Sequence, residues 1–456
     1  MSPRGGDVRR SALERTLSLF AEVKAGEGLV CLLLTLDIFF VLTSYLIAKV
    51  VREPLILAGG GAEVKSYSSA LQAIVLVLFL RVYAVLVARF PRRRLINTVT
   101  IFFAACLVGF YALYGMDVPI GVVYYVWVGI FSLMVIAQFW AFANDVYTAE
   151  QGKRLFVIIQ FGASAGGVFG PLLARALIDR LAVNDLLLVS AALLLVSLAI
   201  GNVVEARYLR RGARAADPAP EAEPVMSRAG AFRVVFRSRY LLMIAMIILL
   251  TNWVNTTGEY VLGKAVYNAA SDDAVRTGLT EVQREAAVET SIGRFYAEFF
   301  SIVGLVGLLA QLFVVSRVIR HFGVKAAILF LPAVAMGAYA TIAVFPVLAV
   351  IRWPKVAENA TDYSLNNTVR HILFLPTTRE EKYKAKVAID SFFVRAGDVL
   401  SALVVFVGVT FLGFGIRHFA AFNLALIAAW VAIAYWTGRE NQRLVAAAGA
   451  KEGEGR

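Results

Sequence analysis

Long apolar runs with few charges recur along the chain between residues 28 and 438. A helix needs about 20 such residues to cross the hydrocarbon layer of a bilayer. Charged residues make up only 17% of the sequence, whereas a soluble domain has about 25%. These features exclude a soluble enzyme, a disordered protein and a disulfide-stapled secreted domain. The chain is predicted to be an all-α membrane protein that crosses the bilayer many times.

The apolar runs form two sets of six predicted spans, separated by a polar, proline-rich stretch at 216–224 that is typical of a flexible linker. The predicted spans are 28–50, 66–88, 95–115, 120–146, 154–178 and 184–204, followed by 239–263, 292–318, 324–343, 346–371, 386–413 and 417–438. The predicted organisation is an N-terminal segment 1–27, a six-helix bundle 28–204, a linker 205–238, a second bundle 239–440 and a tail 441–456.

The basic residues indicate how the chain is oriented. The sequence has 45 Lys and Arg against 32 Asp and Glu, an excess that would suggest nucleic acid in a soluble protein. Here the excess lies in short loops at 89–94 and 374–386 and in the linker, whereas the loop at 264–290 is mainly acidic. Basic loops stay on the cytoplasmic side. We therefore predict no nucleic-acid partner, an inner (cytoplasmic) membrane location, and cytoplasmic N-terminus, linker and C-terminus.

The N-terminal 27 residues are charged and contain no short apolar core with a cleavage site, so the first span is expected to anchor the chain. The two halves also resemble each other. Segment 87–96 aligns without gaps with 318–327, matching Arg89 to Arg320 and Arg94 to Lys325. A duplicated six-helix bundle places its substrate site where the repeats meet, near the middle of the membrane.

Ionisable side chains in and near the predicted spans are the main candidates for function, because a charge in the bilayer is costly unless it faces protein or water. They carry a surplus of cations, which suggests an anionic solute. These residues are Asp37, Lys49, Arg52, Glu53, Asp145, Glu259, Lys264, Arg294, Glu298, Arg352, Lys355, Glu358, Asp362, Arg370, Asp390, Arg395 and Asp398.

Purely structural roles are the alternative for several of these charges. Arg52 and Arg370 lie near the ends of their spans and could extend into the lipid headgroups. Lys355 and Glu358 share one helical face and could neutralise each other. Two further pairs could form in the same way: Asp390 with Arg395, and Arg294 with Glu298.

Catalytic and metal-binding patterns are missing from the sequence. The three histidines and the two cysteines, Cys31 and Cys106, have no metal-ligand or disulfide spacing. Gly162, Gly166 and Gly170 recur every four residues without the lysine of a phosphate-binding loop, so this spacing predicts close helix packing. We expect neither an enzyme, nor a metal site, nor a cofactor.

Three motifs resemble the ATP/ADP translocase family, the nucleotide transporters of plastids and obligate intracellular bacteria. Phe-Trp-Ala-Phe-Ala-Asn-Asp-Val-Tyr-Thr-Ala-Glu-Gln-Gly-Lys-Arg-Leu-Phe at 139–156 is similar to the span-four signature of that family. Tyr-Ser-Leu-Asn-Asn-Thr-Val-Arg-His-Ile-Leu-Phe-Leu-Pro at 363–376 resembles its span-ten signature, and 384–390 resembles the start of its span eleven. The resemblance implies a major-facilitator-like fold of twelve transmembrane helices in two pseudo-symmetric bundles that exchanges ATP for ADP plus phosphate.

The resemblance also implies candidate substrate-binding residues. The two lysines and two glutamates that matter in the family fall on Arg52, Asp145, Glu259 and Arg370, three of them changed in length or head group but not in sign. We include the neighbouring Lys49 and Asn144 as further candidates. Arginine binds phosphate as a planar fork and lysine as a point charge, so these changes indicate a divergent member.

The leading hypothesis is therefore a nucleotide antiporter, active as a monomer in the bilayer, with a nucleotide or related phosphorylated anion as its substrate. Arg52 and Arg370 are expected to clamp phosphate, and Asp145 and Glu259 to pair with them when the site is empty. One alternative is a proton-coupled transporter of another solute that uses Asp37, Glu259 or Asp398. The other is a membrane sensor or scaffold that does not transport.

Overall fold

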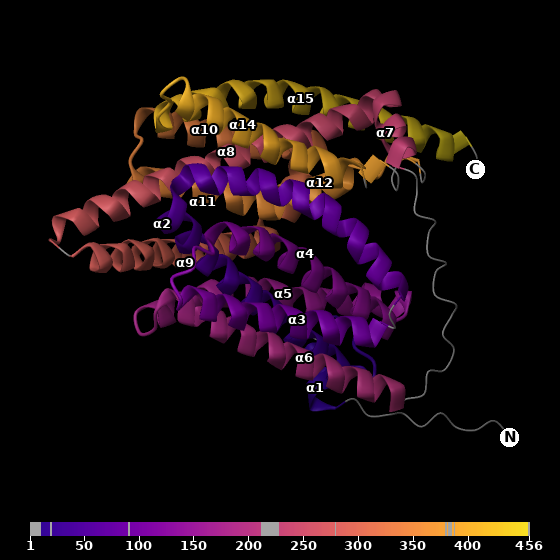
Figure 1. Cartoon of the computed structure of the whole chain (residues 1–456). Helices are drawn as coiled ribbons and strands as arrows, with labels where there is room; N and C mark the ends of the chain where they lie inside the picture. Colours follow the sequence, from indigo (N-terminus) through magenta and orange to yellow (C-terminus); the bar gives the residue numbers. More distant parts are fainter. Residues whose placement is uncertain are drawn as a thin grey trace.

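The computed structural model describes residues 11–18, 21–89, 92–210, 228–278, 280–378, 381, 385–386 and 388–454. Within these ranges the fold is helical throughout, and ten helical stretches are long and apolar enough to cross a membrane. Most helices run nearly parallel or antiparallel to one another, and α7 lies at the same end of the molecule as the last turns of α15 (Figure 1). The prediction of an all-α, multi-pass membrane protein is confirmed.

The N-terminal half consists of one very long helix and four shorter ones that pack around it. Short α1 (Ala12–Leu17) precedes them. The long helix is α2 (Gly28–Arg89), which contacts α4, α5 and α6. The others are α3 (Arg92–Tyr114), α4 (Gly121–Val146), α5 (Ala149–Ile178) and, after a short 3₁₀ turn at Val183–Asp185, α6 (Leu186–Arg210).

The C-terminal half begins with α7 (Arg228–Arg237) and α8 (Arg239–Arg276). It continues with α9 (Glu281–Phe313), α10 (Val315–Val344), α11 (Leu348–Thr361), a π turn η2 (Asp362–Asn366) and α12 (Asn367–Leu373). A second π turn η3 (Ile389–Phe393) leads into α14 (Val394–Thr410), and α15 (Ile416–Glu454) ends the chain. Helix α8 packs against α14 and α15, and α10 packs against α15 and α11.

Several predicted boundaries are wrong because helices continue past the ends of the apolar runs. The predicted break between residues 50 and 66 does contain the point where α2 turns back, at Gly61, whose φ of 73° favours glycine, but the residues on either side of it are helical. Helices α8 and α9 fill most of the predicted loop at 264–290. Helix α15 extends through most of the predicted tail from 441. Of the predicted linker, 211–227 lies outside the described residues, and its two ends are helical.

Glycines on α5 allow it to lie directly against the first part of α2, as their spacing predicts. A β-carbon at Gly162 would lie 2.4 Å from the carbonyl oxygen of Thr35, and one at Gly166 would lie 2.5 Å from that of Phe39. The prediction that this stripe serves helix packing is confirmed. It fixes the position of α2, which carries most of the buried charges described below.

The halves meet through α2 and α5 on one side and α8, α9 and α14 on the other. Among the described residues, the side-chain hydrogen bonds and ion pairs that cross between the halves lie from the middle of the molecule to the end where α2 turns at Gly61. The ones nearest that end join Arg294 to Asp179, Lys264 to Glu63, and Tyr114 to Glu289. Helix α7 and the last turns of α15 lie at the opposite end (Figure 1).

Candidate functional site

Glu53 on α2 lies in the centre of the molecule between two cationic side chains. Its carboxylate is fully buried and accepts hydrogen bonds from Arg52, with Nε at 3.1 Å from Oε1. Its other oxygen lies 2.6 Å from Lys65 Nζ, and the Lys65 side chain is 4% exposed. Because α2 folds back at Gly61, Lys65 returns alongside residues that precede it by three turns. The turn therefore brings three charges of one helix together.

Glu259 on α8 connects these residues to the C-terminal half. Lys65 Nζ lies 3.7 Å from Glu259 Oε2, and Lys355 Nζ on α11 lies 3.9 Å from Glu259 Oε1. Lys355 is fully buried and forms a 2.8 Å ion pair with Glu358. Glu259 itself keeps 25% of its side chain exposed. It is the carboxylate that both halves share and that water can still reach.

A glycine on α8 makes room for Lys355. A β-carbon at Gly258 would lie 2.7 Å from Lys355 Nζ and would overlap the hydroxyl of Tyr339. The Tyr339 hydroxyl donates a 3.2 Å hydrogen bond to the carbonyl of Val254 on the same helix. The backbone of α8 thus comes close enough to α11 and α10 for the lysine to lie beside Glu259.

Aromatic side chains contact three of the cations. The Arg52 guanidinium lies 4.4 Å from the centre of the Tyr125 ring, and Lys49 Nζ lies 4.4 Å from the centre of the Phe300 ring. Lys65 Nζ donates a 3.3 Å hydrogen bond to the Tyr296 hydroxyl. Cations are stabilised over aromatic faces when water is excluded. These rings come from α4 and α9, so both halves supply them.

We call this group the central cluster; it consists of Lys49, Arg52, Glu53, Lys65, Glu259, Lys355 and Glu358. Its four cationic and three acidic side chains leave a surplus of positive charge. Removing such charges from water costs several kcal/mol per ion unless they are paired. An arrangement that keeps one cation in excess is suited to receive an anion.

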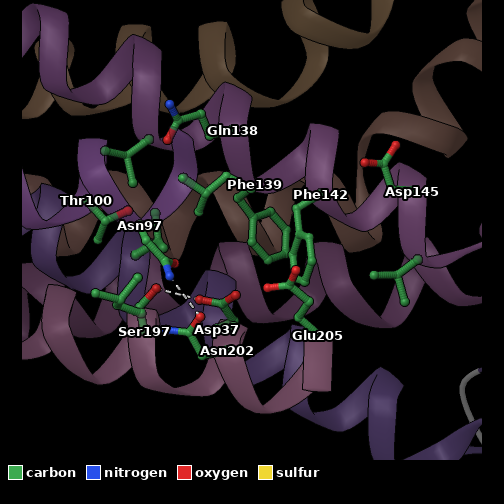
Figure 2. Close-up of a pocket in the computed structure, with 16 residues that line it drawn as sticks. Asp37, Asn97, Thr100, Gln138, Phe139, Phe142, Asp145, Ser197, Asn202 and Glu205 are labelled. Atoms are coloured by element: carbon green, nitrogen blue, oxygen red, sulfur yellow. Dashed lines mark hydrogen bonds between the residues drawn. The ribbon is translucent and has the colours of Figure 1, made fainter. Parts of the chain in front are cut away.

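The structure brings three of the predicted site residues together and leaves three outside. Lys49, Arg52 and Glu259 belong to the central cluster. Asn144 and Asp145 are exposed at the end of α4, roughly 30 Å along the helix from Tyr125, and Asp145 lines a separate pocket (Figure 2). Arg370 lies on α12, about 22 Å along the chain from Lys355.

The predicted ion pairs are wrong in most cases. Arg52 pairs with Glu53 and Arg370 pairs with Asp390 at 3.1 Å, where pairs with Asp145 and Glu259 were expected. In place of the pairs within 390–395 and 294–298, the structure has three others: Arg395 with Asp398, Arg294 with Asp179, and Arg352 with Glu298. The predicted pair of Lys355 with Glu358 is confirmed.

Lys65 is the member of the central cluster that the sequence analysis did not single out at all. Glu53, Lys355 and Glu358 were listed among the charges of the spans but not among the predicted substrate-binding residues. Lys65 falls in the predicted break between two spans, so a helix through that segment was not expected. Lys355 was interpreted as half of a neutral pair, although Glu259 also lies beside it. The adjacent pair Gly258-Glu259 was the sequence feature that could have indicated Lys355, because a glycine next to a buried charge permits close approach of another side chain.

Comparison with known protein families identifies the superfamily of the chain. The model of the Major Facilitator Superfamily matches residues 29–357. The chain belongs to this superfamily. It is a multi-pass secondary transporter and not an enzyme.

The curated relatives of this superfamily member include ADP,ATP carrier proteins. ADP,ATP carrier protein 1 of Chlamydia trachomatis is 24% identical over 361 residues, covering 71% of this chain and 65% of the relative. The Chlamydia muridarum protein of the same name is 23% identical over 308 residues, covering 60% of this chain and 55% of the relative. The chain thus matches less than two thirds of the length of these relatives, and the resemblance found in its motifs is confirmed.

Solved transporters share the fold of this superfamily member at low sequence identity. A bacterial homologue of the iron transporter ferroportin, in the inward-facing state, aligns with a TM-score of 0.61 at 13% identity over 90% of this chain and 98% of that one. The nucleoside transporter NupG aligns with a TM-score of 0.60 at 11% identity over 89% of this chain and 98% of that one. These likenesses establish the major-facilitator fold.

Proposed function

We propose that the chain is an antiporter that exchanges nucleotides, or closely related phosphorylated anions, by alternating access. In this proposal α2, which is one of the ten candidate stretches, crosses the membrane twice, once on each side of Gly61. Helix α11, the turn η2 and helix α12 together form one further crossing. The total is then twelve, arranged as bundles over 28–204 and 239–440. The central cluster lies where these bundles meet and is the substrate site.

The observation that carries the proposal is a central cluster to which both halves contribute cations and in which the cations outnumber the acids. Arg52 and Lys65 come from the N-terminal half, and Lys355 comes from the C-terminal half. A nucleotide carries several negative charges that must leave water when it enters the membrane. Phosphate oxygens can accept charge-assisted hydrogen bonds from all three side chains. The ADP,ATP carriers among the relatives support the same class of substrate.

Substrate binding in this site competes with the carboxylates for the lysines. Lys65 joins the halves through Glu259 and through the Tyr296 hydroxyl. A phosphate bound to Lys65 replaces Glu259 as its partner, and the weak contacts at 3.7 and 3.9 Å are the first to separate. Binding of the substrate therefore loosens a link between the halves, and this loosening permits the change from one facing state to the other.

The same network explains why such a transporter would exchange substrates. In the empty site the lysines return to Glu259, and the link between the halves is restored. Reorienting the empty protein would separate Lys65 from Glu259 and leave buried charges unpaired, which is costly. The empty protein therefore reorients slowly, and a second nucleotide from the opposite side is needed to release the link.

We place the termini and the linker in the cytoplasm and the Gly61 end on the outer side of the inner membrane, on the basis of the basic loops. Because the described ion pairs between the halves extend to the Gly61 end, the described conformation is closed outside and faces inward. The protein is proposed to act as a monomer.

Counter-flow in proteoliposomes tests this function directly. Vesicles containing purified protein and unlabelled ADP should take up labelled ATP in a saturable manner, and vesicles without internal nucleotide should not. Lys65→Gln and Lys355→Gln should each lower the uptake by about tenfold or more, because each removes a charged hydrogen bond to phosphate.

Lys325→Gln is the matched control for these variants. Lys325 lies on α10 over the ring of Tyr435, at 5.2 Å, outside the central cluster. It should retain counter-flow. Uptake that follows a pH gradient regardless of internal nucleotide would instead support a proton-coupled transporter, and absence of both uptake and thermal stabilisation by nucleotide would support a protein that does not transport.

A further inference from the structure

A pocket lies inside the N-terminal half, away from the central cluster. Its volume is about 190 Å³, and α2, α3, α4 and α6 enclose it. Figure 2 shows polar side chains from several of these helices around it. Its wall runs from Asp145, which is exposed, to Asp37 and Gln138, which are buried. Both buried residues lie in the spans, and the function proposed above uses neither of them.

Asp37 supplies the pocket with a buried carboxylate that lacks a cationic neighbour in the described structure. It is 5% exposed, and the described residue that hydrogen-bonds it is Ser197, whose hydroxyl donates to Oδ1 at 2.5 Å. Its Oδ2 points toward Gly201 on α6, where a β-carbon would be 3.4 Å away. None of the described residues that line the pocket is basic. A buried carboxylate needs a counter-charge or a proton.

Gln138 is an independent sign that the pocket takes a ligand. It is 4% exposed, and neither its amide nitrogen nor its amide oxygen has a hydrogen-bond partner among the described residues. Buried polar groups are almost always satisfied, so each exception needs an explanation. By contrast, Asn97 and Asn202 in the same wall bond to each other at 3.1 Å. Among the described residues, Gln138 therefore has a free donor and a free acceptor in a pocket whose other two amides bond to each other.

Apart from Thr100 and two further carboxylates, Asp145 and Glu205, the rest of the wall is apolar, which limits the class of ligand. Val41, Val135, Phe139, Phe142 and Leu198 form most of it. An apolar cavity of about 150 Å³ holds a benzene ring, so this slightly larger pocket has room for one ring with short polar groups. A bare metal ion would gain nothing from these side chains, and no group of three metal-binding side chains exists among the described residues.

We propose that this pocket binds a small organic amine with a single ring and a second polar group. Its ammonium donates hydrogen bonds to Asp37, its ring lies among the phenylalanines and aliphatic side chains, and its second polar group bonds to Gln138. Charge-assisted hydrogen bonds are the strong ones, and aromatic faces favour a cation. This site is separate from the central cluster and does not depend on nucleotide exchange.

Thermal unfolding of the full-length purified protein tests the site with three related probes. Tyramine has an ammonium, a ring and a hydroxyl; tyrosol lacks the ammonium, and phenethylamine lacks the hydroxyl. Tyramine should raise the unfolding temperature in a saturable manner, since only a ligand of the folded state does so. Phenethylamine should bind more weakly, and tyrosol should bind at least tenfold more weakly than tyramine.

Variants of the two key residues separate their roles. Asp37→Asn should weaken the binding of tyramine about tenfold or more, so that its affinity comes close to that of tyrosol. Gln138→Leu should make the affinities for tyramine and phenethylamine equal. Asp398→Asn is the control, because Asp398 is also buried but is already paired with Arg395, Asn252 and Thr256. It should retain the tyramine response. The Gln138 comparison remains decisive if Asp37→Asn does not fold.

Three results would overturn the assignment. Equal stabilisation by tyrosol and tyramine would show that the ammonium is not recognised. An unchanged tyramine response in Asp37→Asn and Gln138→Leu would place the amine elsewhere. Saturable stabilisation by sodium chloride but not by caesium chloride, without a response to tyramine, would assign the pocket to an inorganic cation.

Discussion

Two buried carboxylates on the same helix have opposite surroundings. Glu53 in the central cluster is held between Arg52 and Lys65, whereas Asp37 in the N-terminal pocket has a hydroxyl as its described hydrogen-bond partner. The protein itself compensates the first charge and leaves the second for a ligand or a proton. The difference teaches that burial alone does not identify a substrate residue; what matters is which groups of the protein already satisfy it.

The largest expected effect comes from removing the compensated charge. Glu53→Gln should lower the free energy of unfolding by about 3–5 kcal/mol, because it leaves two buried cations without their partner. Thermal unfolding in detergent would measure this loss. A second change that also removes a cation, Lys65→Gln in the Glu53→Gln background, should recover part of it. If Glu53→Gln has the same unfolding temperature as the unmodified protein, the pairing inferred for the central cluster is wrong.

Asp37→Asn is the counterpart in the pocket, and its own effect on stability should be small. The amide keeps an oxygen for the Ser197 hydroxyl and no cation loses a partner, so the change should stay within about 1 kcal/mol. A loss as large as that of Glu53→Gln would remove the contrast between the two carboxylates.

Helix α2 carries both carboxylates, so a change in its packing should disturb both regions together. Gly166→Ala would place a carbon 2.5 Å from the carbonyl oxygen of Phe39, an overpacking that costs about 1–3 kcal/mol. It should lower both nucleotide counter-flow and tyramine binding. Gly167→Ala is the matched control, because a β-carbon there meets nothing within 4 Å. Equal behaviour of the two variants would mean that the close approach of α5 and α2 is unimportant.

The smallest effect concerns an exposed contact between the halves. Arg294 and Arg175 donate hydrogen bonds to Asp179 and hold the pKa of its carboxyl below the ordinary value. The contact is therefore intact above pH 4 or so, the usual pKa of aspartate, and is lost as the pH falls through the lowered pKa. Below that pH, the distance between spin labels placed on α5 and α9 at the Gly61 end should increase slightly.

Asp179→Asn is the control for this experiment and should give distances that do not depend on pH in this range. The effect is small because both side chains are about half exposed, and water screens such pairs. A pH response that persists in Asp179→Asn would point to another titrating group at this end.

Sequence reasoning was most reliable where periodicity and composition carry the information. It predicted the helical, multi-pass character and the packing role of Gly162 and Gly166, because membrane crossing and close helix contact depend on local residue types. It was less reliable for helix ends. Residues 51–65 include Arg52 and Lys65, so the segment looks polar in sequence, yet both side chains are buried against Glu53.

The partners of individual charges were the weakest part of the prediction. The structure places Arg52 and Glu259 in one cluster, as expected of neighbours, but the sequence led us to expect Arg370 there and not Lys355. Spacing along a helix identifies residues on a common face and says nothing about which other helix faces them. The pocket around Asp37 escaped notice for the same reason, since its walls come from four helices.

By itself the sequence determined that this chain is a membrane protein, is built of helices and carries more cations than anions among them. Each of these properties follows from single residues or from residues close together in the sequence. The tertiary structure alone decided which charges compensate each other. Lys65 reaches Glu53 only because the backbone reverses at Gly61, and Lys355 reaches Glu259 only because Gly258 lets two helices touch. Electrostatic energy depends on distances in space, and those distances arise from the packing of the whole chain.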